Sequence, residues 1–280
     1  MSRSKMEFDY AEILEFDDQF HEKFGELGDK FIPILGASKY SVTGKTLIGL
    51  MASANSVKLG IYDLAEACDT HLYVLKVLHR TLIEHYLKFH YILLRALKEQ
   101  SDDVGLEYRK YSTISETLAF INASEASMKI AGKPIDAQVL KKLRKDHPDL
   151  NISKRDLNEI TYKWKHRSII KYIKANSSFI KNESAYLLKL IPEYAELSSF
   201  IHGGTFAEEY YHEVFSEGKL REQMYYEVSE AAMMAATMKV HLMILVVTID
   251  DTFQQGLEDL MSIIMSSASE THNKKRQDDA

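Results

Sequence analysis

Cysteine, proline and glycine are all scarce in this chain of 280 residues. It has one cysteine, Cys68, four prolines and 12 glycines. A single cysteine excludes a disulfide framework within the chain and every zinc or iron–sulfur site built from several cysteines. So few prolines and glycines do not suit a β-sandwich, a β-barrel or a collagen-like chain. Because 45% of the residues are hydrophobic, the chain can bury a core, and the sequence predicts an all-α helical bundle.

The sequence also lacks the usual signs of secretion and of a membrane span. No basic segment followed by an apolar run begins the chain, so we expect no secretory signal. The longest apolar stretch, residues 231–249, is interrupted by Lys239 and His241 and is followed by Asp250 and Asp251. These charges favour a buried core helix over a transmembrane helix. We therefore expect a cytoplasmic protein with no membrane segment.

Charge is distributed unevenly around a net value of −6. Residues 141–174 contain eleven lysines and arginines against four acids, whereas residues 203–230 contain seven acids against two bases. The basic segment is either a binding surface or a solvated helix face. The whole chain is too acidic for non-specific binding to nucleic acid.

Helical spacing of apolar residues predicts a bundle with long helices at both ends. The N-terminal helix is expected over 7–31, closed by Pro33 and Gly36, and the last helix over 221–264. Further helices are expected over 42–60, 69–97 (capped by Asp69 or Thr70), 102–128, 137–144 and from about 183 to 202. The domain organisation that follows is an N-terminal helix at 1–36, a bundle at 37–265, and a disordered polar tail at 266–280.

Two polar stripes stand out on otherwise apolar helices. Lys76, Arg80, Glu84 and Lys88 recur every four residues in the helix expected over 69–97, which places them along one face. This stripe faces either solvent or an internal cleft.

Tyr194, Ser198 and His202 form a second stripe with the same spacing. Gly203 is suited to end that helix, and His202 in its last turn would be favoured as imidazolium by the helix dipole.

Eleven histidines raise the question of a metal site, but the spacing argues against one. Glu209 and His212 form a single Glu-x-x-His pair, whereas di-iron bundles need two such pairs and two further glutamates. The sequence has neither His-Glu-x-x-His nor the Gly-x-Ser-x-Gly elbow of hydrolases. We expect no metal and no cofactor.

The order of three motifs is similar to that of a known family. An Arg80-x-x-x-Glu84 helix, the lone Trp164 in a basic turn and Tyr194-x-x-Leu197-Ser198-x-x-x-His202 follow one another. Across about residues 52–204 the chain resembles a bacterial domain-of-unknown-function family, number 5677. Such domains look like the HEPN superfamily of helical proteins, many of which are metal-independent ribonucleases of toxin and antiphage systems with an Arg-x(4 to 6)-His motif. Arg80 followed by His85 fits that motif.

The resemblance implies an endoribonuclease in which a histidine transfers a proton and Arg80 binds the phosphate. The histidine is His202, which shares a face with Tyr194 and Ser198, or His85, which the motif selects; Glu84 would orient the arginine or a histidine. Lys76, Lys88 and Trp164 would contact RNA, with tryptophan stacking on a base, although a tryptophan in such a turn more often anchors the loop on the core.

Two other interpretations stay open. The first is a non-catalytic sensor that binds a ligand, or a partner protein of a toxin or defence system, through the same residues. The second is a buried hydrogen-bond network that only fixes helix packing. We also expect a homodimer, because methionines and leucines including Met238 and Leu242 make residues 231–249 more apolar than one packed face requires. The alternative is that the helix over 7–31 covers this surface within one chain.

Overall fold

The computed structural model describes residues 10–67, 69–133, 145, 148, 154–176 and 184–278. Within these ranges the chain is helical and contains no strand, which confirms the predicted all-α class. The helices are α1 (Tyr10–Ala37), α2 (Ser41–Ala67), α3 (Leu72–Glu99), α4 (Asp103–Ile130), α6 (Lys154–Lys163), α7 (His166–Asn176), α8 (Ser184–His202), α9 (Thr205–Ser216), α10 (Leu220–Ile249) and α11 (Gln254–Asp278), with short 3₁₀ turns η1 (Asp69–His71) and η4 (Asp251–Phe253). Cys68, the helix expected over 137–144 and most of the basic segment before residue 154 lie outside the described residues.

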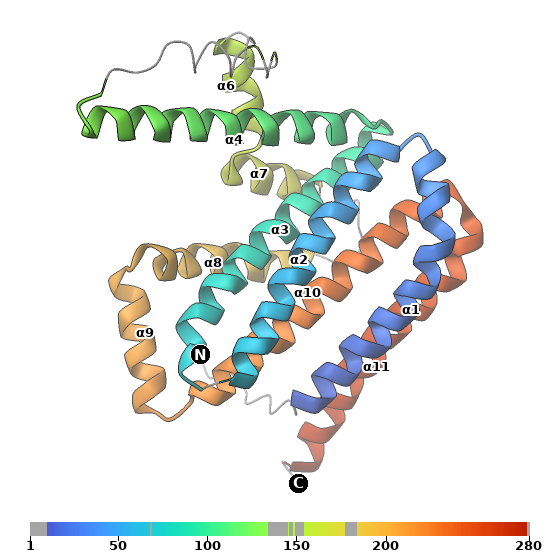
Figure 1. The fold of residues 1–280 in the computed structure, drawn as a ribbon. Helices are drawn as coiled ribbons and strands as arrows, with labels where there is room; N and C mark the ends of the chain where they lie inside the picture. Colours follow the sequence, from blue (N-terminus) through green and yellow to red (C-terminus); the bar gives the residue numbers. More distant parts are fainter. Residues whose placement is uncertain are drawn as a thin grey trace.

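The core lies where α2, α3 and α10 pack together (Figure 1). The middle of α3 is buried on nearly every side, with Leu82, Tyr86 and Phe89 fully enclosed. A helix that is apolar almost all round is stable only inside a bundle. On one side α1 and α11 lie next to each other against α10, and on the other side α8 and α7 cover α3.

The N-terminal helix is part of this bundle and is not a separate unit. It continues through Pro33 to Ala37, so the prediction that Pro33 and Gly36 close it was wrong. Phe31 and Leu35, on either side of the proline, are buried, and this packing outweighs the loss of one backbone hydrogen bond. Because α1 packs on α10, it covers the apolar surface of residues 231–249, which is the alternative to a homodimer considered from the sequence.

That packing removes the surface on which a homodimer was predicted. Met238 and Leu242 are fully buried within one chain. Homodimerisation stays a prediction, but these two residues are core, so charged substitutions there should unfold the chain. The same burial bears on α10, which is long and apolar enough to cross a membrane, since 67% of its most apolar window is buried inside the bundle.

Helix ends differ from the prediction at three points. Instead of one helix over 221–264, α10 ends at Ile249, and Asp250 accepts a hydrogen bond from the backbone N–H of Thr252 in η4. The segment expected to be a disordered tail is helical through Asp278. Helix α3 begins at Leu72 after η1, three residues later than expected, and its N-cap position is taken by His71.

The connection between α3 and α4 fixes the start of α2. Asp102 accepts hydrogen bonds from the backbone N–H groups of Val42 and Thr43 at 2.8 and 2.6 Å. A carboxylate at a helix N-terminus satisfies donors that have no partner within the helix. Gly105 in the first turn of α4 approaches closely here, because a Cβ at Gly105 would lie 2.6 Å from the backbone nitrogen of Thr43.

Candidate functional site

The two polar stripes meet at Arg80. Its guanidinium donates to the Tyr194 hydroxyl at 2.7 Å and to the Ser198 hydroxyl at 3.3 Å, which joins α3 to α8. A third hydrogen bond, at 3.1 Å, runs to Glu84 one turn further along α3. The Arg80 side chain is 18% exposed, so the guanidinium lies at the border between the core and solvent.

Glu84 is shared between two cations. Lys88 donates to its second carboxylate oxygen at 2.7 Å. Burial alone would raise the pKa of Glu84, but the hydrogen bond and charge of Lys88, together with Arg80, lower it below its ordinary value. Glu84 is therefore ionised at neutral pH. This carboxylate holds the Arg80 guanidinium in one orientation.

The histidine that joins this group is His166. Its ring stacks on the Tyr194 ring with centroids 3.8 Å apart and planes at 16°, and the Arg80 guanidinium carbon lies 4.4 Å from the centroid of the same Tyr194 ring. We refer to Arg80, Glu84, Lys88, His166, Tyr194 and Ser198 as the Arg80 cluster.

His166 is in the form that can accept a proton. Burial lowers the pKa of His166 below its ordinary value of 6.5; Glu84 opposes the shift and Arg80 adds to it. Its Nε2 is buried and makes no hydrogen bond within the described part of the chain. A neutral imidazole with one unbonded ring nitrogen is equipped for acid–base chemistry or for binding a ligand.

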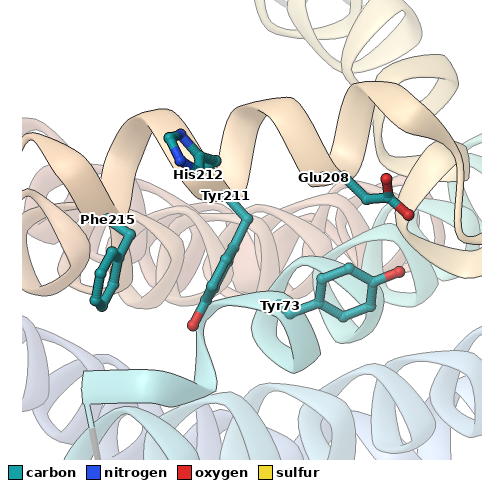
Figure 2. A pocket seen from close by; sticks show the side chains of 5 residues that line it. All are labelled: Tyr73, Glu208, Tyr211, His212 and Phe215. Atoms are coloured by element: carbon teal, nitrogen blue, oxygen red, sulfur yellow. The ribbon is translucent and has the colours of Figure 1, made fainter.

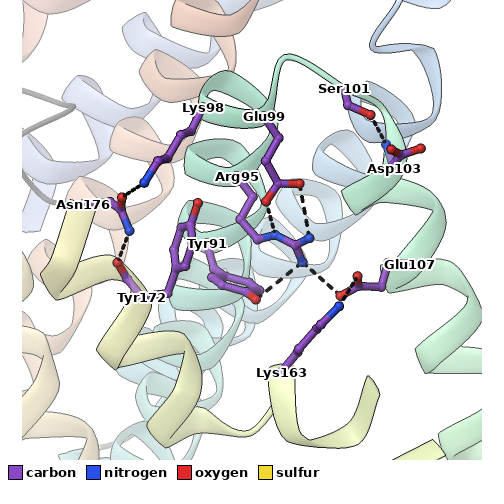
Figure 3. A network of polar contacts seen from close by, with 10 residues as sticks. All are labelled: Tyr91, Arg95, Lys98, Glu99, Ser101, Asp103, Glu107, Lys163, Tyr172 and Asn176. Carbon is purple, nitrogen blue, oxygen red and sulfur yellow. Dashed lines mark hydrogen bonds and ion pairs between the residues drawn. The ribbon is translucent and has the colours of Figure 1, made fainter. Parts of the chain in front are cut away.

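Trp164 and Lys163 position His166, which is the first residue of α7. Trp164 precedes α7 and is 4% exposed. Its ring contacts the rings of Tyr108 and Tyr91, each at 5.1 Å between centroids, so it anchors the turn between α6 and α7. Lys163 donates to Glu107 of α4 at 3.2 Å (Figure 3).

Arg95 of α3 completes this network from the core side. It donates to Glu107 at 2.9 Å and to Glu99 at 2.8 Å (Figure 3). Lys98 donates to Asn176, the last residue of α7, at 2.5 Å. Because both ends of α7 are tied to fixed groups, the direction of the His166 ring is set by tertiary contacts.

The outer face of α7 is basic. Arg167, Lys171 and Lys174 are exposed and spaced by four and three residues, so they lie along one face, while Ile169 and Ile173 are buried. The basic segment recognised in the sequence thus forms, in its described part, a positively charged helix face that starts next to His166.

Four residues expected at the site lie elsewhere or have another role. Trp164 is a core anchor and is not available to stack on a base. Lys76 is 5% exposed and pairs with Glu227, so it does not line a substrate surface.

His85 and His202 do not contribute to the hydrogen bonds of Arg80. His85 is five residues from Arg80 and points about 140° away around α3, and its Nδ1 lies 2.8 Å from the Thr81 carbonyl oxygen. His202 is exposed at the end of α8, whereas the Arg80 cluster is partly buried.

A second polar group, which sequence analysis did not identify, lies inside the bundle. Glu227 of α10 is fully buried and pairs with both Lys76 and His79 of α3. Burial would raise the pKa of Glu227, but its two partners lower it to about 2. Nearby Glu193, next to Tyr194 in α8, has its pKa raised, chiefly by burial.

Comparisons with protein-family models, with curated proteins and with solved structures give no match to this chain. The function is therefore inferred from the geometry of the Arg80 cluster. Among the described residues no three histidine, cysteine, aspartate or glutamate side chains are grouped so as to hold a metal ion.

The sequence contained a signal for His166 that spacing rules do not use. This histidine follows a lone tryptophan between two helices, and a buried tryptophan fixes its neighbours on the chain. For Glu227, the signal was a single acid between Met224 and Val228 in an apolar helix that had to pack beside Lys76 and His79.

Proposed function

We propose that this protein is a metal-independent endoribonuclease with its reaction centre at the Arg80 cluster. The observation that carries the proposal is the Tyr194 ring, which stacks on the imidazole of His166 and bonds through its hydroxyl to the guanidinium of Arg80. A general base and a fixed cation are the two groups that cleavage of RNA through its own 2′-hydroxyl requires.

Each group has a defined part in the proposed reaction. The neutral imidazole of His166 accepts the proton of the ribose 2′-hydroxyl as that oxygen attacks the adjacent phosphorus. Arg80 and Lys88 stabilise the negative charge that develops on the phosphate. The pKa of Tyr194 is raised, mainly by burial, so its hydroxyl stays protonated and supplies the proton of the departing 5′-oxygen. The products are a cyclic phosphate and a free 5′-hydroxyl; the nucleophile is internal, so no metal-bound water is needed.

The basic face of α7 supports RNA as the substrate. Arg167 and Lys171 extend from His166 along exposed positions, where cations attract a phosphate backbone without reading its sequence. The net charge of −6 restricts this attraction to one surface.

One observation favours a second candidate. All three groups that Arg80 contacts through hydrogen bonds belong to the protein itself, as in an arginine that fixes the packing of two helices. The second candidate is therefore a non-catalytic module that keeps the Arg80 cluster intact and uses its exposed side to recognise a phosphate-bearing ligand, or a partner protein in a toxin or defence system.

Incubation of the purified full chain with end-labelled RNA, with and without a chelator, tests the proposal. We expect cleavage that survives chelation and leaves a 2′,3′-cyclic phosphate. His166→Ala and Arg80→Ala should abolish it, while His85→Ala and His202→Ala retain it. Binding of RNA without cleavage by the wild type would favour the second candidate. Cleavage that needs added magnesium, or that survives in His166→Ala, would overturn the mechanism.

A growth assay addresses the biological setting. If the activity belongs to a toxin or antiphage effector, expression of the wild-type chain in a bacterial cytoplasm should arrest growth, and expression of folded His166→Ala should not. Equal growth inhibition by both chains would contradict this role.

A further inference from the structure

A pocket of about 390 Å³ lies between α9 and the start of α3 and is separate from the Arg80 cluster. Its lining is Tyr73 from α3 together with Glu208, Tyr211, His212 and Phe215 from α9. Glu208, Tyr211 and Phe215 are spaced by three and four positions and therefore share one face of the helix, and His212 lies four positions after Glu208. Figure 2 shows the three aromatic rings in a row under α9, with the carboxylate of Glu208 at the Tyr73 end.

Two of the rings are fixed in place before any ligand binds. The Tyr73 hydroxyl donates to the carbonyl oxygen of Phe200 at 2.6 Å, and its ring contacts the Phe200 ring at 5.3 Å between centroids. The Tyr211 hydroxyl lies 3.5 Å from the carbonyl oxygen of Thr70, to which it donates. Because both hydroxyls are directed to backbone oxygens, the apolar rings are the surfaces offered to the pocket.

The third ring is exposed at the edge of the pocket. Phe215 is 62% exposed, an arrangement that leaves a large apolar group in water. A ligand covering this ring would remove that surface from solvent.

The charge around the pocket is negative. The lining itself is almost wholly apolar, whereas Glu208 at its edge and Glu209 and Glu213 on the same helix are exposed. Lys76, one turn along α3 from Tyr73, is already neutralised by Glu227.

We propose that the α9 pocket binds an alkylated ammonium group. Faces of aromatic rings attract a cation through their quadrupole, and the attraction is strongest when the cation also brings apolar surface that leaves water, as methyl groups on nitrogen do. The exposed carboxylate of Glu208, at the Tyr73 end of the row of rings (Figure 2), supplies the opposite charge from the edge of the pocket. A small quaternary amine and the side chain of a methylated lysine present the same chemistry to the pocket.

Ligand-detected NMR with the full chain tests this proposal. Choline is the probe, and 3,3-dimethyl-1-butanol, which has the same shape without the charge, is the matched control. We expect choline to bind with a millimolar Kd and the neutral alcohol to bind at least about tenfold more weakly. Equal binding of the two would show an apolar groove and overturn the proposal, as would no choline binding to the folded chain.

Variants locate the site. Phe215→Leu and Tyr211→Leu keep apolar surface but remove a ring face, so each should weaken choline binding several-fold, as should Glu208→Gln. Phe206→Leu, an exposed aromatic on α9 that does not line the pocket, should leave it unchanged. Choline binding that persists unaltered in both Phe215→Leu and Glu208→Gln would place it elsewhere and contradict the assignment.

A short peptide carrying one trimethyl-lysine, compared with the same peptide unmodified, separates the two sources of the cation. Tighter binding of the methylated peptide than of choline would identify a protein side chain as the ligand. Binding of choline alone would identify a free small amine.

Discussion

The His166 imidazole stacks on the ring of Tyr194, with centroids 3.8 Å apart, although the two residues come from different helices. Through Tyr194 the imidazole is linked to Arg80. His166 belongs to neither of the two polar stripes that the sequence shows on α3 and α8. The contact therefore adds α7 to the site, whereas the sequence predicts a site built from α3 and α8 alone.

The pH dependence of RNA cleavage should report His166. The neutral imidazole is the proposed base, and the pKa of His166 is lowered from 6.5, chiefly by burial, so activity should rise with pH through a midpoint below 6.5 and be complete at neutral pH. Rates of single-turnover cleavage across pH measure this. A midpoint above 6.5 would be inconsistent with His166 as the base.

Tyr194→Phe separates the stacking of Tyr194 from its hydroxyl. The variant keeps the ring beneath His166 but loses the hydrogen bond from Arg80 and the proposed proton donor, so kcat should fall by about 10²- to 10⁴-fold while RNA affinity changes little. Ser198→Ala is the matched control, since it removes the longer hydrogen bond of Arg80 and no proposed acid. An equal loss in both variants would argue that only helix packing matters.

Trp164→Ala should destabilise the protein by about 3 to 5 kcal/mol, because it leaves a cavity among Tyr91, Tyr108 and Tyr111. It should also reduce cleavage, since α7 loses its anchor. Urea unfolding followed by circular dichroism gives the free energy of unfolding. Tyr162→Ala, two residues away at an exposed position, should change it by less than about 0.5 kcal/mol. A small effect of Trp164→Ala would show that Lys163 and Asn176 suffice to hold α7.

Glu227→Gln should cost about 3 to 5 kcal/mol, since it leaves the charge of Lys76 buried without a counterion and removes the carboxylate that His79 contacts. The pKa of Glu227 is lowered to about 2 from 4.5. Its contribution is thus present above pH 4.5 and is lost as the pH falls towards 2. Denaturant titrations at several pH values check both statements, with Glu217→Gln in an exposed ion pair as the control. If both substitutions changed the free energy of unfolding by the same small amount, burial of the Glu227 ion pair would not matter for stability.

Lys239→Met should stabilise the protein by about 1 to 3 kcal/mol at pH 7. Burial, with the nearby charge of Lys58, lowers the pKa of Lys239 to about 8 from 10.5, and Asp17 opposes the shift. The unfolded chain then binds more protons between these two values, so the stability of the wild type should rise from about pH 8 to 10.5. The variant should lack this rise and exposed Lys30→Met should retain it. A flat wild-type profile would show that Lys239 keeps its charge when folded.

Helical spacing predicted most of the fold, because burial in a bundle imposes a period that any window of sequence displays. Its failures at Pro33 and Asp250 are local. Packing of Phe31 and Leu35 carries α1 past the proline, and Asp250 ends α10 by accepting the N–H of Thr252. Neither effect changes the spacing of apolar residues in the sequence, so the periodicity could not predict it.

The candidate site could be predicted only in part. The sequence predicts Arg80, Tyr194 and Ser198 as site residues because polar side chains on apolar helices need hydrogen-bond partners. In the structure Arg80 donates to both Tyr194 and Ser198. Spacing on a helix does not say which stripe members become buried, so Lys76 was placed with Arg80 although it pairs with Glu227. His166 depends on the anchoring of Trp164 by α3 and α4, which is a property of the folded chain.

The Arg80 cluster also has a bearing on how the chain folds. Arg80 is 118 residues from Ser198 and 114 from Tyr194 along the sequence, whereas its bond to Glu84 spans four. Closing long loops costs chain entropy that local contacts do not, so α3 with its Arg80–Glu84 pair can form early, while the docking of α8 and α7 onto it comes late. In a nascent or partly unfolded chain, Arg80 is then in place before His166 has docked beside it. A chain that cleaves RNA through this site can do so only after its last long-range contacts have formed.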